Sequence, residues 1–113
     1  MLAAPSAMRA TELQCQAAIV EAAKLAGWRV HAERTSRTQS GGYATAIQGH
    51  PGWPDLVLTR PPRLMVVELK RKPYKLTDDQ HLWLHELSEC GVETRIVWVP
   101  EGQDEFIKEL TKR

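Results

Sequence analysis

Two short apolar runs, separated by only five residues, constrain the fold of this chain more than any other feature. Residues 56–58 and 64–67 have strand length, and residues 59–63, with two prolines at their centre, connect them. So short a connection predicts that the two strands are antiparallel neighbours. Unbroken apolar runs are also typical of strands that are buried on two faces. The sequence therefore predicts a buried β-hairpin.

Charged residues stand at the open end of this hairpin. Asp55 directly precedes the first run, and Glu68 and Lys70 end the second. Antiparallel pairing predicts that Asp55 and Glu68 converge. Side chains two residues apart on a strand share a face, which places Glu68 and Lys70 together. Solvated charges on an edge strand are the alternative interpretation, but charges on strands this apolar favour a functional site.

The rest of the chain predicts one compact domain, because its 113 residues are 42% hydrophobic and 26% charged. We expect a flexible leader over residues 1–10 and a domain over 11–113. Its predicted elements are a helix over 11–26, a strand over 28–33, the two apolar strands, a helix over 77–90, a strand over 92–99 and a helix over 104–111. The long polar segment 34–53 is predicted to be a loop, a kind of segment that often carries function.

Helical spacing predicts that Leu13, Ala17 and Val20, with the stem of Lys24, form the inward face of the first helix. Glu12 lies in the first turn of that helix, where an acidic side chain interacts favourably with the helix dipole and needs no other role. Gln16, one turn later, shares its face and could support it.

The net charge is only +1, but cations gather in one part of the sequence, namely Arg60, Arg63, Lys70, Arg71, Lys72 and Lys75. We expect a basic rim around the acidic centre, which would suit a polyanionic substrate. Cys15 and Cys90 show no spacing for zinc or for a disulfide, which fits a reducing compartment. No run has membrane-spanning length and no signal peptide is apparent, so we expect a cytoplasmic protein, in the host cytoplasm if a phage encodes it.

Several of these features together resemble the PD-(D/E)xK nuclease superfamily, specifically its VRR-NUC branch. They are Gly-Trp-Pro-Asp at 52–55, Glu-Leu-Lys at 68–70, Glu12 and Gln80. The branch comprises small stand-alone virus and phage proteins and the nuclease domain of the Fanconi-anaemia-associated nuclease. The resemblance covers about residues 11–100. It implies an α/β restriction-endonuclease-like fold with an αβββαβ core, in which helices flank a mixed four-stranded sheet.

The resemblance also implies a Mg²⁺ or Mn²⁺ site. Asp55, Glu68 and the backbone carbonyl of Leu69 would be the principal ligands, and Glu12 a further one, direct or through water. Hard oxygen ligands suit these ions better than zinc. Such an ion provides an ionised water near neutral pH and neutralises phosphate charge. Lys70 would hold the attacking water or the scissile phosphate.

Gln80 has two possible roles. Residues 77–80 read Thr-Asp-Asp-Gln, a capping box in which Gln80 bonds back to the first residue of the box. Gln80 also shares a helical stripe with Trp83, Leu84 and Leu87, which turns it toward the sheet. We do not expect both roles to be satisfied at once, and the resemblance favours a site role, holding the phosphate or a metal-bound water.

The candidate phosphate contacts are basic residues near the site, namely Arg34, Arg37, Arg71, Lys72 and Lys75. Each of them could instead be an ordinary surface charge. Tyr43 could stack on an unpaired base or pin the long loop to the core. His50 could contact substrate or remain solvated. His81 and His85 have the spacing of a zinc-protease helix but lack its glutamate, so we expect exposed or DNA-facing histidines.

The function that the resemblance implies is a Mg²⁺- or Mn²⁺-dependent DNA endonuclease in phage replication, recombination or repair. Its stand-alone members form homodimers that can cut four-way junctions, which implies a Holliday-junction resolvase-like, structure-selective enzyme acting on branched DNA. Alternatives are a nuclease for flaps or linear duplex, or a catalytically silent DNA-binding module with the same fold. The complete set of site residues favours an enzyme over the silent module.

Overall fold

A computed structural model describes residues 11–33, 36–37, 43–44 and 47–113. Its elements are α1 (Glu12–Leu25), β1 (Arg29–Ala32), β2 (Ser36–Arg37), β3 (Tyr43–Ala44), β4 (Leu56–Arg60), β5 (Arg63–Lys70), α2 (Asp78–Glu89), β6 (Glu93–Trp98) and α3 (Gln103–Thr111). The predicted order is confirmed, with one addition, because β2 and β3 form a short antiparallel pair inside the predicted loop. The predicted leader, residues 1–10, lies outside the described residues.

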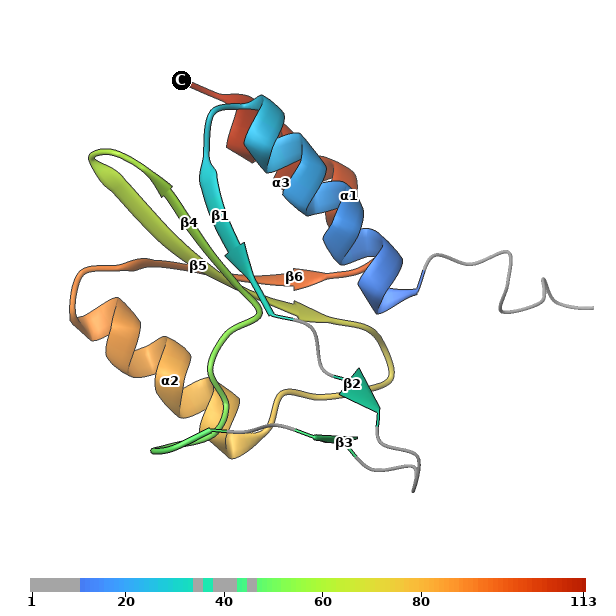
Figure 1. Ribbon diagram of the computed structural model, residues 1–113, viewed down its shortest axis with the longest axis vertical. Coiled ribbons are helices and arrows are strands. Elements are labelled where there is room, and N and C mark those ends of the chain that lie inside the picture. Colours follow the sequence, from blue (N-terminus) through green and yellow to red (C-terminus); the bar gives the residue numbers. More distant parts are fainter. Residues whose placement is uncertain (1–10, 34–35, 38–42, 45–46) are drawn as a thin grey trace, which may run out of the picture.

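The sheet is the expected mixed four-stranded one, with strand order β1-β4-β5-β6. The pairs β1–β4 and β4–β5 are antiparallel, whereas β5–β6 is parallel. The parallel pair requires a crossover connection, and α2 provides it. Helices α1 and α3 lie side by side over one face of the sheet, and α2 covers the other face (Figure 1). The β4–β5 hairpin thus lies in the middle of a three-layer domain.

The hydrophobic core lies between the sheet and the α1–α3 layer. From α1 it takes Cys15, Ile19 and Ala23, all at most 1% exposed, whereas Leu13 is 48% exposed. The predicted inward face of α1 was therefore wrong, although Val20 does pack against the core. Apolar residues occur on several sides of α1, so helical spacing alone does not determine which stripe meets the sheet.

The face of the sheet under α2 is less completely covered. Val66 and the helix residue Leu84 are buried there, but Leu64 is 41% exposed and Val57 is half-buried. The prediction that both hairpin strands are buried on two faces therefore holds only in part. A single helix covers this face. Glu68 and Lys70 lie on the same face as Leu64 and Val66, because alternate residues of a strand share a face.

Capping boxes begin both long helices. The Thr11 side chain accepts the Gln14 amide and the Gln14 side chain accepts the Thr11 amide. Thr77 and Gln80 make the same reciprocal pair at the start of α2. Each box satisfies two backbone N–H groups that the first turn would otherwise leave unpaired. No helix in the described part of the chain has the length and apolar character needed to cross a membrane.

At the turn end of the hairpin, the two arginines both have partners within the protein. The Arg60 guanidinium lies 4.5 Å from the ring of buried Trp28 and donates to the carbonyls of Ala26 and Leu110, at the ends of α1 and α3. Arg63 makes two hydrogen bonds to Glu93, at 2.9 and 2.8 Å. The predicted basic rim was therefore wrong for Arg60 and Arg63, because an antiparallel hairpin holds its turn at the end opposite its open ends.

Candidate active site

Asp55 lies at the open end of the hairpin and is held from both sides. Its Oδ2 accepts the Leu69 amide of β5 at 2.8 Å, and its backbone carbonyl accepts the Glu33 amide at the end of β1 at 3.2 Å. The side chain thus takes the place of a β4 backbone acceptor just where the β4–β5 ladder ends. These bonds fix the carboxylate next to β5, as the hairpin predicts.

Glu68 is the neighbouring carboxylate, and it is 2% exposed. Its Oε2 accepts a hydrogen bond from Nε2 of Gln80 at 3.2 Å. Its Oε1 is buried and has no hydrogen-bond partner among the described residues. A buried carboxylate oxygen without a partner is costly, because it has lost its water and gained nothing.

Gln80 makes the predicted cap bond and also a hydrogen bond into the site, whereas its predicted role of holding the phosphate or a metal-bound water stays a prediction. Its Oε1 accepts the Thr77 amide at 2.8 Å while its Nε2 donates to Glu68. The two ends of a primary amide are chemically different, one accepting and the other donating, so a single side chain can serve the cap and the site together. The cap bond and the bond to Glu68 therefore do not exclude each other.

Burial shifts the pKa values of both carboxylates upward. Burial, followed by the charge of Asp55, raises the pKa of Glu68 to about 9. Burial likewise raises the pKa of Asp55, although the hydrogen bond from the Leu69 amide and the charge of Lys70 oppose the change. The pair therefore favours sharing a proton over carrying two charges.

Glu12 comes to this site from the other layer. It is half-buried, and its pKa is raised first by burial and then by the charge of Asp55, while Lys70 and Arg71 lower it. The first turn of α1 therefore brings a third carboxylate into electrostatic contact with the pair. Gln16, one turn later, is 7% exposed and donates to the Glu33 carbonyl at 3.1 Å.

Gln16 thereby joins α1 to the strand end that positions Asp55, since the amide of Glu33 bonds the Asp55 carbonyl. The sequence indicated a shared face with Glu12 but gave no sign of this connection. The bond runs across 17 residues of sequence, and spacing along one helix predicts no partner at such a distance.

Gly52 brings the Asp55 loop against α2. Its φ is +96°, and a Cβ placed there would lie 2.6 Å from the backbone carbon of Asp79. Only glycine permits both this conformation and this close approach. The loop before Asp55 and the first turn of α2, which bears Gln80, are therefore in direct backbone contact.

The donor set fits a hard divalent cation. Two carboxylates with raised pKa values and one unpartnered buried oxygen are what a cation would relieve. Within a strand, the N–H and C=O of a residue point to the same edge, so the Leu69 carbonyl points to the side where its amide meets Asp55. Among the described residues, no three His, Cys, Asp or Glu side chains form a metal-binding group, so a site here would need this carbonyl or water besides the carboxylates.

The residues predicted to contact DNA are described only in part, and their contacts stay a prediction. Arg71 is half-buried and its charge reaches Glu12, while Lys72 and Lys75 are exposed in the segment between β5 and α2. Arg34 lies outside the described residues. Arg37 and Tyr43 lie in β2 and β3, of which only the backbone pairing is described. The three histidines at positions 50, 81 and 85 are exposed.

Two aromatic features did not follow from the sequence analysis. Tyr74 is 66% exposed between Lys72 and Lys75. Trp53 and Trp83 meet edge to face, with ring centroids 4.9 Å apart. An exposed aromatic residue flanked by lysines is a recognisable sequence signal for nucleic-acid binding, whereas the tryptophan pair joins a loop to a helix and has no local signal.

In a comparison with protein families, the model of the VRR-NUC domain matches residues 10–101. This range includes the carboxylates, Lys70 and Gln80. Searches of curated proteins and of solved structures give no match.

Proposed function

Because the chain belongs to the VRR-NUC family, whose domain is a nuclease domain of the PD-(D/E)xK superfamily, we propose that it is a metal-dependent DNA endonuclease with its active site at the open end of the β4–β5 hairpin. The observation that carries the proposal is the buried pair Asp55 and Glu68. One oxygen of this pair has no partner in the described structure, burial raises the pKa of both carboxylates, and the charge of Asp55 raises the pKa of Glu68 further.

Asp55, Glu68 and the Leu69 carbonyl would hold Mg²⁺ or Mn²⁺, with Glu12 as a further ligand, direct or through water. When bound, such an ion lowers the pKa of a coordinated water and neutralises charge on the scissile phosphate. Lys70, on the same strand face as Glu68, would hold the attacking water or a phosphate oxygen. Gln80 orients the Glu68 carboxylate through its Nε2. Arg71, Lys72 and Lys75 would contact flanking phosphates.

The substrate we propose is branched DNA, cut by a homodimer during phage replication, recombination or repair in the host cytoplasm. The support is the resemblance to the stand-alone VRR-NUC proteins, which act as dimers on four-way junctions. A two-fold dimer presents two equal active sites to two strands. Light scattering at micromolar concentration is expected to give twice the mass of the chain, and a monomer would remove this part of the proposal.

The test is cleavage of a labelled four-way junction and a matched linear duplex in Mg²⁺ and in Mn²⁺. We expect cutting of the junction, dependent on the ion, and its loss in Asp55→Ala and Lys70→Ala. Matched controls are Asp104→Ala and Lys108→Ala, which remove the same charges from exposed positions on α3. The controls are expected to cut as the unaltered protein does.

Each alternative gives a different result in this test. Equal cutting of junction and duplex retains the endonuclease and removes the junction preference. Cutting at flaps alone assigns a different branched substrate. Binding without cutting in either ion favours the silent DNA-binding module and contradicts the proposed enzyme.

A further inference from the structure

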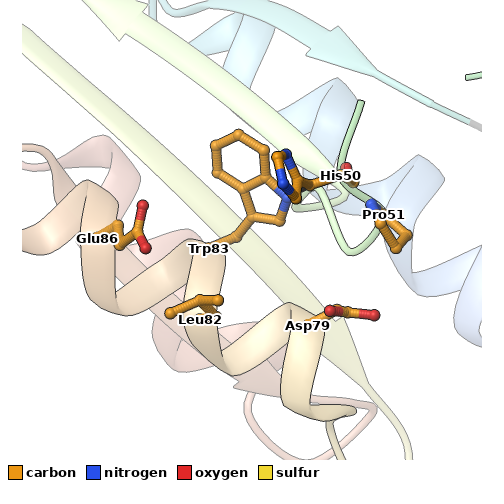
Figure 2. Close-up of a pocket in the computed structure, with 6 residues that line it drawn as sticks. All are labelled: His50, Pro51, Asp79, Leu82, Trp83 and Glu86. Carbon is orange, nitrogen blue, oxygen red and sulfur yellow. Dashed lines mark hydrogen bonds between the residues drawn. The ribbon is translucent and has the colours of Figure 1, made fainter. Parts of the chain in front are cut away.

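A hollow of about 270 Å³ lies beside the candidate active site, between the loop that leads to Asp55 and helix α2 (Figure 2). The residues that line it are His50, Pro51, Asp79, Leu82, Trp83 and Glu86. Two are aromatic and two are carboxylates, and all but the half-buried Trp83 are exposed. None of them has a role in the chemistry proposed above.

The aromatic wall of the hollow is fixed in place. Nε1 of Trp83 donates to the backbone carbonyl of His50 at 3.3 Å, which ties the helix to the loop. Trp53 packs edge-on against the same indole, with the two ring planes at 87°. A ring that is already held in place loses little conformational freedom when a flat group stacks on it.

The hollow also lies close to the site in the fold. Asp79 contacts Gly52 through backbone atoms, and its chain neighbour Gln80 donates to Glu68. Asp55 follows Gly52 by three residues. The hollow and the carboxylates are therefore connected through this backbone approach and the first turn of α2.

The negative charge of the lining favours the base of a nucleotide over its phosphate. The carboxylates of Asp79 and Glu86 disfavour a phosphate, but they accept hydrogen bonds from amino groups. An aromatic wall suits a flat base. Resting on the proposed nuclease function, we propose that this hollow binds one unpaired, amino-bearing base of the DNA substrate, next to the position of cutting.

The chemistry predicts a preference between two pyrimidines of nearly equal size. Cytosine carries an amino donor at N4, where thymine carries a carbonyl oxygen and, next to it, a methyl group. Asp79 or Glu86 would accept the cytosine amino group and repel the thymine carbonyl. A base without an amino group would still stack on Trp83 but would lose this hydrogen bond.

The experiment compares the binding of short fluorescent oligo-dC and oligo-dT by anisotropy, with the full chain in EDTA so that no cutting occurs. We expect oligo-dC to bind about fivefold more tightly, at the low end for a base-edge contact because these carboxylates are exposed. In Asp79→Asn/Glu86→Gln the ratio of the two affinities is expected to fall to about one. The ratio is the readout because it is insensitive to a general change of charge.

The matched control is Asp78→Asn/Glu89→Gln, which removes the same two charges from exposed positions of α2 outside the hollow. Both double variants should bind all DNA somewhat more tightly, because each loses two negative charges. Only the variant in the hollow should lose the preference for oligo-dC. An equal loss in both would overturn the proposal.

Other results would also overturn it. Equal affinity of the unaltered protein for oligo-dC and oligo-dT would exclude selection by the carboxylates. Binding of oligolysine that is lost only in Asp79→Asn/Glu86→Gln, with no base preference, would assign the hollow to a cationic protein segment. If the protein cuts DNA but shows no base preference, the proposed base binding is wrong and the proposed nuclease function is retained. If it shows the base preference but does not cut, the proposed base binding is supported and the proposed nuclease function is contradicted.

Discussion

The two ends of the β4–β5 hairpin shift the pKa values of their carboxylates in opposite directions. At the turn, Arg63 lowers the pKa of Glu93 through their hydrogen bonds, and Arg95 joins Glu93 to Glu109 of α3. At the open end, Asp55 and Glu68 have raised pKa values. At the turn end each of these carboxylates is paired with an arginine, which favours stability, and the open end keeps an excess of carboxylate oxygen, which favours binding a cation.

The largest expected effect is on activity at the open end. Asp55→Asn keeps an acceptor for the Leu69 amide but removes the negative charge, so we expect cleavage to fall about 10²–10³-fold with little change in stability. Rates from single-turnover cleavage and melting curves from circular dichroism would measure the two effects. A variant that cuts normally would move the active site away from this end.

At the turn end we expect the reverse pattern. Arg60→Ala removes hydrogen bonds to three carbonyls and the contact with the Trp28 ring, at a cost of about 1–3 kcal/mol in the free energy of unfolding. The cleavage rate of the folded protein should not change. Urea unfolding, with Arg29→Ala on exposed β1 as the control, would measure the cost. A loss of activity without loss of stability would contradict the division between the two ends.

The pH dependence of stability should come mainly from Glu68. Because its pKa is raised from 4.5 to about 9 in the folded chain, the metal-free protein holds a proton more firmly when folded than when unfolded. The contribution of Glu68 to stability is therefore fully present below about pH 4.5 and is lost as the pH rises to about 9. Added Mg²⁺ should restore stability on the alkaline side.

Removing the titrating group should flatten this profile. We expect Glu68→Gln to raise the free energy of unfolding at pH 8 by about 0.5–2 kcal/mol without metal, and to abolish the stabilisation by Mg²⁺. Thermal unfolding across pH, beside Glu89→Gln, would test this. An unaltered slope in Glu68→Gln would assign the effect to another group.

The smallest expected effect concerns the two hydrogen bonds of Gln80, one to the Thr77 amide and one to Glu68. Gln80→Glu keeps an acceptor for the Thr77 amide but removes the donor to Glu68, so we expect slower cleavage with a change in stability below about 1 kcal/mol. Thr77→Ala should do the opposite, costing about 1 kcal/mol of stability with cleavage retained. If both variants lost activity equally, the effect on cleavage could not be assigned to the bond with Glu68 rather than to the helix cap.

Local signals in the sequence were enough to predict the elements and the open end of the hairpin. Thr11 and Thr77 mark helix starts through contacts within four residues, and the short connection fixes which strand ends meet. Long-range partners were not predictable. The bond from Gln16 to the Glu33 carbonyl, the approach of Gly52 to Asp79 and the stacking of Arg60 on Trp28 depend on how layers pack, which no local pattern specifies.

The contact between Gly52 and Asp79 also bears on how the protein tolerates mutation. Main-chain atoms of the Asp55 loop and α2 approach each other directly at this point, and the side chains of Trp53 and Trp83 join the same two segments. At position 52 even a methyl group would push the loop away from the helix that carries Gln80 and the wall of the hollow. In a mutational scan, Gly52→Ala should therefore resemble a substitution of a site residue, although glycine has no side chain to take part in the chemistry.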